Sequence, residues 1–356
     1  MTFNGSSSAL KHTRIVPTLD TPMEDGMNII WCSSFAAAWK TFSETIVEGD
    51  IKIEDPPETA TLLNIAPDPR PDVPEKCLYT AAGFLEDGIV EKIRKDLNEK
   101  FPYKRAPKFP SHDRSSAIVY AYLEADVKYM IQYNQKPGPL FFTGSDGNKV
   151  GVMAFGIPSD NHTFKEQPRI LFRSDNSTPA NFEFALDLCV NSSPSQIIVA
   201  CMKKEPSLAA ALKKMEQREI KWTKKIRAKL GGYADWVLRG GIESSDTIFV
   251  PNMFWGISHR YTELVGRILE NDGFQNMGIA EARQDILFRL DHIGAALKPE
   301  SQFTPNASSI NHDSFDNYDS FDYIVDRPFL ICIKKRGASL PYFAMWVDNA
   351  ELLIPW

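Results

Sequence analysis

Cys32 is the side chain whose type and position most directly suggest covalent chemistry. It precedes the predicted helix in "NIIWCSSFAAAW", where the helix dipole would favour a thiolate, and His162 or His259 could supply the base. The alternative is a small apolar side chain buried beside Trp31 and Phe35, because cysteine is among the most buried residue types. No oxyanion-hole signature accompanies Cys32, so we favour the structural role and keep a cysteine hydrolase as a third alternative.

The histidines and aspartates do not form a metal-ligand pattern. The six histidines include no pair at helical i,i+4 spacing. Asp313, Asp316, Asp319 and Asp322 recur every third residue, but an EF-hand loop also needs a glycine at its sixth position and a terminal glutamate. Neither is present. The dinucleotide, P-loop and nucleophile-elbow motifs are absent as well. We therefore predict no metal and no cofactor, and we expect the chain not to be an enzyme.

The stretch "HDSFDNYDSFDYIVDRPFLICIKKRG" changes character halfway. Its first half sets aromatic residues among acids, and its second half is a dense apolar strand that begins after Arg327-Pro328. It could be a ligand or metal site, a disordered tether or a displayed loop, and the strand that anchors its far end favours the loop. Aromatic side chains make good anchors for protein recognition. The predicted exposed contact residues are Phe315, Asp316, Asn317, Tyr318, Phe321 and Tyr323.

Charge is distributed unevenly along the chain. The whole sequence carries a formal charge of -6, which gives no general reason to expect nucleic-acid binding. Residues 203–230 nevertheless contain ten basic residues and three glutamates. A basic helix face can bind a polyanion by releasing its counterions, or it can simply be a solvated face. Polyanion binding by this segment is therefore a secondary expectation.

Composition places the chain among ordinary globular proteins. It has 356 residues, of which 43% are hydrophobic and 24% charged. No window approaches the roughly 20 apolar residues that span a membrane, so we expect no membrane association. The five cysteines are widely spaced and no secretory signal precedes them, which favours reduced thiols in the cytoplasm. We predict a polar, loosely held lead-in at 1–27 and a single domain at 28–356.

Hydrophobic periodicity predicts helices among many strands. Residues 86–101 repeat apolar side chains at helical spacing, and 207–230 form the longest helical pattern, with Leu208, Met215, Trp222 and Ile226 on one face. Residues 138–157 predict a hairpin with its turn at Asp146-Gly147. Residues 246–269 predict a strand, broken at Pro251, that leads towards a helix. Because most predicted strands connect by short turns, the pattern favours an α+β fold with large antiparallel or mixed sheets.

Several of these segments resemble the serpin family. The clearest is "FDYIVDRPFLICIKKRGASLPYFAMWVDN", and "NIIWCSSFAAAW", "AIVYAYLEADVKY" and "FVPNMFWGISHRYTELVGRILENDGFQNMGI" are similar at the level of pattern. The resemblance implies one domain with about eight helices, three sheets and an exposed loop at about 300–325. It also implies that the strand at 287–297 lies centrally in a large sheet. A serpin of the inhibitory kind would present this loop as bait to a serine-type endopeptidase and then insert it as a new strand.

The residues that would form the hinge of such a loop oppose insertion. They are Leu297, Lys298, Pro299 and Glu300, and Pro305 follows. Proline cannot donate to a strand ladder, and buried charges without partners are costly, so full insertion would cost several kcal/mol. We therefore expect a serpin-like protein whose loop meets a protein partner, with a protease as one candidate and suicide trapping not expected. The runner-up is a non-inhibitory interaction or storage module on the same fold.

Overall fold

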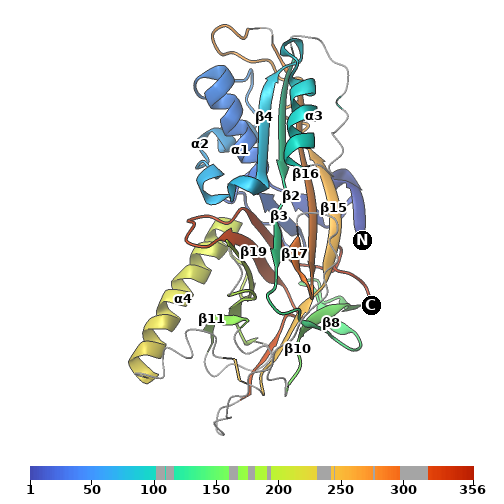
Figure 1. Cartoon of the computed structure of the whole chain (residues 1–356), viewed down its shortest axis with the longest axis vertical. Helices are drawn as coiled ribbons and strands as arrows, with labels where there is room; N and C mark the ends of the chain where they lie inside the picture. The colour runs from blue at the N-terminus through green and yellow to red at the C-terminus, as the bar shows by residue number, and fades with distance from the viewer. Residues whose placement is uncertain are drawn as a thin grey trace.

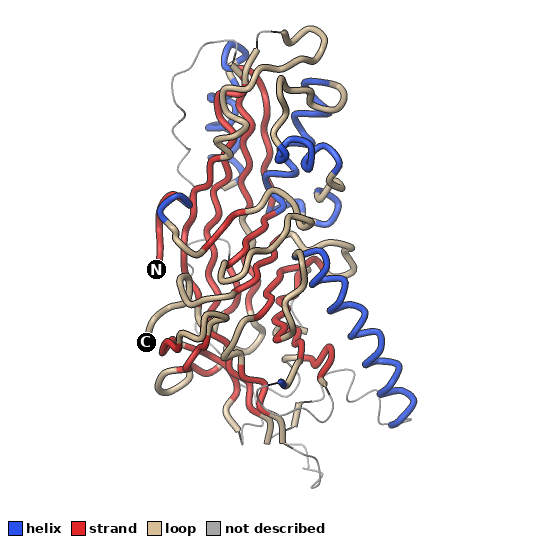
Figure 2. The backbone as a smooth tube through the Cα atoms, turned by 180° about the vertical axis from the view of Figure 1, so that it is seen from behind, coloured by secondary structure: helices blue, strands red, loops and turns tan. Residues whose placement is uncertain are grey.

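The chain folds into an elongated α+β body, as predicted (Figure 1). The computed structural model describes residues 1–101, 109, 116–159, 167–174, 181–190, 194–230, 242–243, 245–275, 277–296 and 320–356. Its longest strands run along the long axis, and its helices lie on the outside (Figure 2). The two termini lie near each other on one side of the body (Figures 1 and 2).

The described residues contain four α-helices, where about eight were expected. They are α1 (Ser33–Phe42), α2 (Glu58–Ile65), α3 (Ile89–Lys100) and α4 (Leu208–Leu230). The helix predicted to follow residue 251 is not there, because the chain closes consecutive turns in which Leu264 N–H donates to Tyr261 O and Val265 N–H to Thr262 O. None of the described helices is long and apolar enough to cross a bilayer.

The first sheet is mixed and has seven strands in the described part of the chain. Its strands are β1 (Phe3–Ser6), β15 (Met253–Arg260), β16 (Ile279–Asp291), β5 (Ala117–Leu123), β4 (Leu78–Phe84), β17 (Gly294–Ala296) and β6 (Asp126–Lys128). β16 lies centrally, with β15 antiparallel on one side and β5 parallel on the other. The predicted central strand at 287–297 is therefore confirmed in its position, but it is not one strand. The chain turns at His292 and returns as β17.

Strand β5 shows why its sequence reads as one continuous apolar run. All of its side chains are buried, because helices cover both faces of this end of the first sheet. Ala117, Val119 and Ala121 face the cluster that contains α1, whereas Ile118 and Tyr120 face α3. Successive side chains of a strand point to opposite faces of the sheet, so alternate residues of this one apolar segment pack into two different cores.

The second sheet carries the largest core. In order, its strands are β11 (Arg169–Arg173), β12 (Phe184–Asp187), β13 (Ser195–Cys201), β19 (Phe329–Lys335), β20 (Phe343–Val347), β3 (Asn28–Cys32) and β2 (Thr13–Ile15). It packs against the first sheet through stacked aromatic side chains. The ring centroids of Phe288 and Phe343 lie 4.6 Å apart, and Trp255 packs beside both. Helix α4 lies against β11 on the outside of this sheet (Figure 1).

Two smaller sheets complete the described structure. One contains β18 (Asp322–Ile324), β14 (Thr247–Pro251), β10 (Ala154–Ile157) and β7 (Asn134–Gln135), and the other is the hairpin of β8 (Leu140–Thr143) and β9 (Lys149–Val152). The hairpin confirms the predicted turn. Gly147 has a φ of 79°, a backbone conformation that favours glycine.

The first 27 residues are not a loosely held lead-in, so that prediction is wrong. β1 is parallel to β15 at the edge of the first sheet, and β2 is parallel to β3 at the edge of the second. Between them lies the short 3₁₀-helix η1 (Ser7–Ala9). The polar side chains of this stretch were misleading, because edge strands satisfy their backbone groups on one side and leave many side chains in water.

Candidate functional site

The segment predicted to be a displayed loop begins at β17. Asp291 Oδ1 accepts a hydrogen bond of 2.8 Å from Ile293 N–H, which closes the turn after β16. β17 then pairs antiparallel with β16 on one side and with β6 on the other. A Cβ added to Gly294 would lie 2.2 Å from the backbone oxygen of Val127, so only glycine fits where this short strand enters the sheet.

Strand β16 is already paired on the side where β17 enters. Residues 279–285 face β5, and residues 289–291 face β17. Only Ile286, Leu287 and Phe288 lie between these two partners. A longer strand continuing from Ala296 would therefore have to separate β5 from β16, which are joined in parallel register.

The segment returns to the body at Ser320. Ser320 Oγ donates to Ser245 O over 2.7 Å, and Phe321 N–H donates to Asp246 Oδ1 over 2.8 Å. β18 then lies parallel to β14. Both ends of the 297–319 segment are thus fixed in sheets, which confirms the prediction that its far end is anchored.

Arg173 fastens the returning end. Its guanidinium carbon lies 3.7 Å from the ring centroid of Phe321 and 5.5 Å from that of Trp222 on α4. Its Nη1 donates to Tyr323 Oη over 3.0 Å. Burial raises the pKa of the nearby Asp246 carboxyl to about 6, although two backbone N–H groups and Arg173 favour its ionised form. Sequence reasoning missed Arg173 and Asp246, because both contacts join segments that are distant in the chain.

Only two of the six predicted contact residues, Phe321 and Tyr323, lie among the described residues, and neither is fully exposed. Tyr323 is fully buried and packs edge-on against Phe184 at 5.4 Å, so its prediction as an exposed contact is wrong. Phe321 is half-buried beneath Arg173 and is largely an anchor. The error arose because β18 alternates buried and exposed positions, which the acidic neighbours concealed. The other contact residues (Phe315, Asp316, Asn317 and Tyr318) and the hinge residues (Leu297, Lys298, Pro299 and Glu300) lie outside the described residues.

Helix α4 presents a basic outer face. Its buried side includes Leu208, Met215, Trp222 and Ile226, as the periodicity predicted. Arg218 is held inward by an ion pair of 2.7 Å with Glu183. The exposed cations are Lys213, Lys214, Lys221, Lys224, Arg227 and Lys229. They leave this face strongly positive, although the whole chain is acidic.

Cys32 is placed as a structural residue. It lies at the N-terminal end of α1 as predicted, but only 3% of its surface is exposed. Burial raises the pKa of its thiol, which opposes thiolate formation despite the helix dipole. His259, one proposed base, instead contacts Ser7, and His162 lies outside the described residues. Among the described residues, no cluster of three or more potential metal ligands occurs.

Comparisons with known proteins give similarities of fold. No family model and no curated protein matches the sequence. A thermophilic serpin, tengpin, in its native state is 13% identical with a TM-score of 0.47, over 93% of this chain and 90% of its own. A highly specific serpin of the insect Tenebrio molitor is 12% identical with a TM-score of 0.47, over 90% of this chain and 92% of its own. Mouse protein-Z dependent protease inhibitor is 11% identical with a TM-score of 0.49, over 92% of this chain and 91% of its own.

Proposed function

We propose that this serpin-like chain displays its 297–319 segment to a protein partner and does not insert it as a full strand. A serine-type endopeptidase is the partner class that the family resemblance implies, and it would meet the segment as a substrate. The observation that supports this proposal is the closed state of β16, which has β5 and β17 as neighbours on the side that an inserted strand would need.

Cleavage of the displayed segment is therefore expected to leave thermal stability unchanged. The chain is incubated with trypsin-, chymotrypsin- and elastase-type proteases, cuts within 297–319 are identified by mass spectrometry, and the nicked protein is melted. Insertion would add a paired strand and raise the melting temperature, whereas a retained closed sheet would move it by no more than about 2–4 °C.

The same mixtures separate substrate behaviour from trapping. A denaturing gel is expected to show cleaved chain and free protease, with no covalent complex. A complex that survives denaturation, or a melting temperature that rises well beyond that of uncut chain, would contradict the proposal. Resistance of the segment to every protease, with no partner captured by the intact chain, would favour the storage alternative.

A second candidate function is polyanion binding by α4, and the exposed cations of its outer face favour it. Replacing Lys213, Lys221 and Lys224 together with glutamine is expected to lower the salt concentration that elutes the chain from immobilised heparin. Each cation that contacts the polyanion contributes about one released counterion. The slope of log affinity against log salt concentration should therefore become shallower by roughly three.

A matched triple variant controls for net charge. Lys92, Arg94 and Lys95 are exposed on α3, and their replacement with glutamine removes the same charge from another helix. If both variants eluted from heparin at an equally lowered salt concentration, the attraction would depend only on net charge. The proposed site on α4 would then be wrong.

A further inference from the structure

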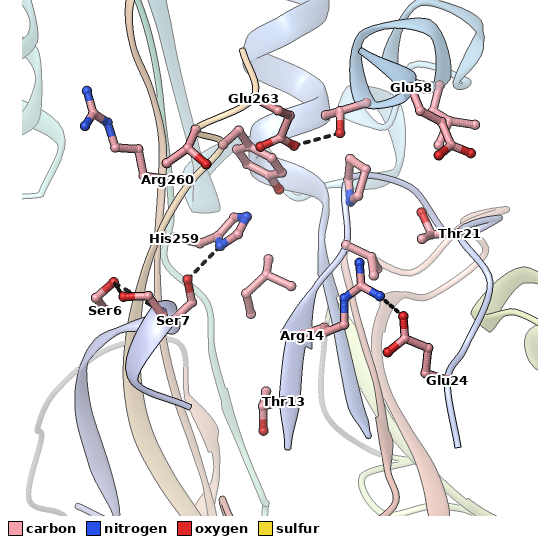
Figure 3. Close-up of a pocket in the computed structure, with 18 of the residues that line it drawn as sticks. Ser6, Ser7, Thr13, Arg14, Thr21, Glu24, Glu58, His259, Arg260 and Glu263 are labelled. Carbon is pink, nitrogen blue, oxygen red and sulfur yellow. Dashed lines mark hydrogen bonds and ion pairs between the residues drawn. The ribbon is translucent and has the colours of Figure 1, made fainter. Parts of the chain in front are cut away.

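A groove lies where the N-terminal crossing passes the end of β15 (Figure 3). Its volume is about 800 Å³, which is enough for a small organic molecule. Residues of η1 and β2 form one wall, and α2 and the turn after β15 form another. The groove is distant in sequence from the displayed segment and shares none of its anchoring residues.

Within this groove, Ser7 Oγ lies 2.7 Å from His259 Nδ1. Figure 3 shows the hydroxyl and the imidazole directed toward each other from η1 and β15. The contact follows from the sheet register, since Ser6 and Ser258 are partners in the parallel β1–β15 pair. Ser7, the first residue of η1, and His259, the next residue of β15, then lie side by side. The distance is that of a nucleophile and its general base.

The surroundings of His259 keep its imidazole in the neutral form. Burial lowers the pKa of the imidazole to about 4, and the charge of Glu263 opposes this shift. The ring is therefore neutral near pH 7, and Glu263 would favour the imidazolium that forms when a proton arrives. Tyr261 packs edge-on against the ring at 4.5 Å, which restricts its rotation.

A purely structural role would explain the hydrogen bond alone. Ser7 could simply fix η1 against β15, as many surface serines fix a turn. That role does not require an open groove beside the hydroxyl. The hydrogen bond and the groove occur together here, which is what a serine activated by a neighbouring base needs.

We propose that Ser7 is a nucleophile activated by His259 and that the groove accepts small carboxylic esters. Ser7 Oγ would bond to the acyl carbon while its proton passes to His259 Nδ1. The bond from the acyl carbon to the alkoxide oxygen would break, and the alkoxide would take that proton. Water would then give a proton to His259 and its hydroxyl to the acyl carbon. The bond from that carbon to Ser7 Oγ would break, and Oγ would take the proton back from His259, which releases the carboxylic acid. This activity is independent of the displayed segment.

A fluorophosphonate probe tests the nucleophile on the full-length chain. The probe is expected to add once per molecule, and peptide mapping should place the adduct on Ser7. Ser7→Ala should abolish this adduct, and His259→Asn should slow it about 100-fold or more, the usual contribution of a general base. Ser43→Ala is a matched control, because Ser43 is also partly exposed and its hydroxyl donates to Gly49 O and not to a histidine. This variant should label like the parent chain.

Mapping of the unaltered chain makes the test independent of how well the variants fold. An adduct found elsewhere but never on Ser7 would overturn the proposal. So would an unchanged labelling rate in folded His259→Asn, because Ser7 would then react without its base. Hydrolysis of p-nitrophenyl acetate that is lost in Ser7→Ala would extend the result from labelling to turnover.

Discussion

Replacing Gly156 with alanine is expected to destabilise the chain by about 3 kcal/mol or more, beyond the usual range for overpacking. A Cβ at this position would lie 1.8 Å from Ile248 O and 2.7 Å from Ile248 C, and both are backbone atoms of the neighbouring strand β14. Relief would require β10 and β14 to separate. The midpoint of urea unfolding should fall accordingly, because a domain commonly has only about 5–15 kcal/mol of stability.

The same variant should loosen the returning end of the displayed segment, because β14 also carries β18. We therefore expect proteases to cut the Gly156→Ala chain near Ser320 faster than they cut the parent chain. Gly49→Ala is the matched control, since a Cβ there meets nothing within 4 Å and the change should fall within about 0.5 kcal/mol. A stable Gly156→Ala chain with parental proteolysis would mean that β10 and β14 are not packed as described.

Replacing Arg336 with methionine is expected to cost about 3–5 kcal/mol, the usual penalty for leaving a buried charge without its partner. The Asp187 side chain is fully buried, and its Oδ2 accepts a hydrogen bond of 2.9 Å from Arg336 Nη1. The same guanidinium donates to Cys189 O. Without the guanidinium, the buried Asp187 carboxylate would keep the hydrogen bond that its Oδ1 accepts from Cys189 N–H but would have lost its cation. Urea unfolding measures the loss directly.

A double replacement separates the charge from the packing. Asp187→Leu combined with Arg336→Met removes both charges, and apolar pairs often match the stability of the buried ion pair they replace. The double variant should therefore be more stable than Arg336→Met alone. If the double variant were the weaker of the two, packing around Arg336 would account for the loss and the ion-pair explanation would be rejected.

Local patterns predicted the elements that their own residues determine. The buried face of α4 follows from Leu208, Met215, Trp222 and Ile226, because helical spacing alone brings them together. The hairpin turn follows from Asp146-Gly147 in the same way. The central position of β16 was predicted from the resemblance to serpins, because apolar content alone does not show where in a sheet a strand lies.

Other features depend on partners that are remote in the sequence. Arg173 contacts Phe321 across about 150 residues, and no local pattern distinguishes it from a solvated arginine. Tyr323 was assigned to the surface because aspartates surround it, whereas parallel pairing with β14 directs it into the core. The Ser7–His259 contact likewise needs the β1–β15 register, which the polar N-terminus gave no reason to expect.

The placement of β1 has a consequence for the order in which the molecule is completed. Ser7 and His259 are 252 residues apart, so the N-terminal strand is synthesised long before β15 is available. At about 5–20 residues per second this interval is roughly 10–50 s, and contacts of such sequence separation also form slowly in refolding. During that time β1 has no partner strand, so its backbone groups remain open to other chains. The earliest residues made are therefore among the last to find their partners, and co-translational aggregation should be most sensitive to changes in this N-terminal crossing.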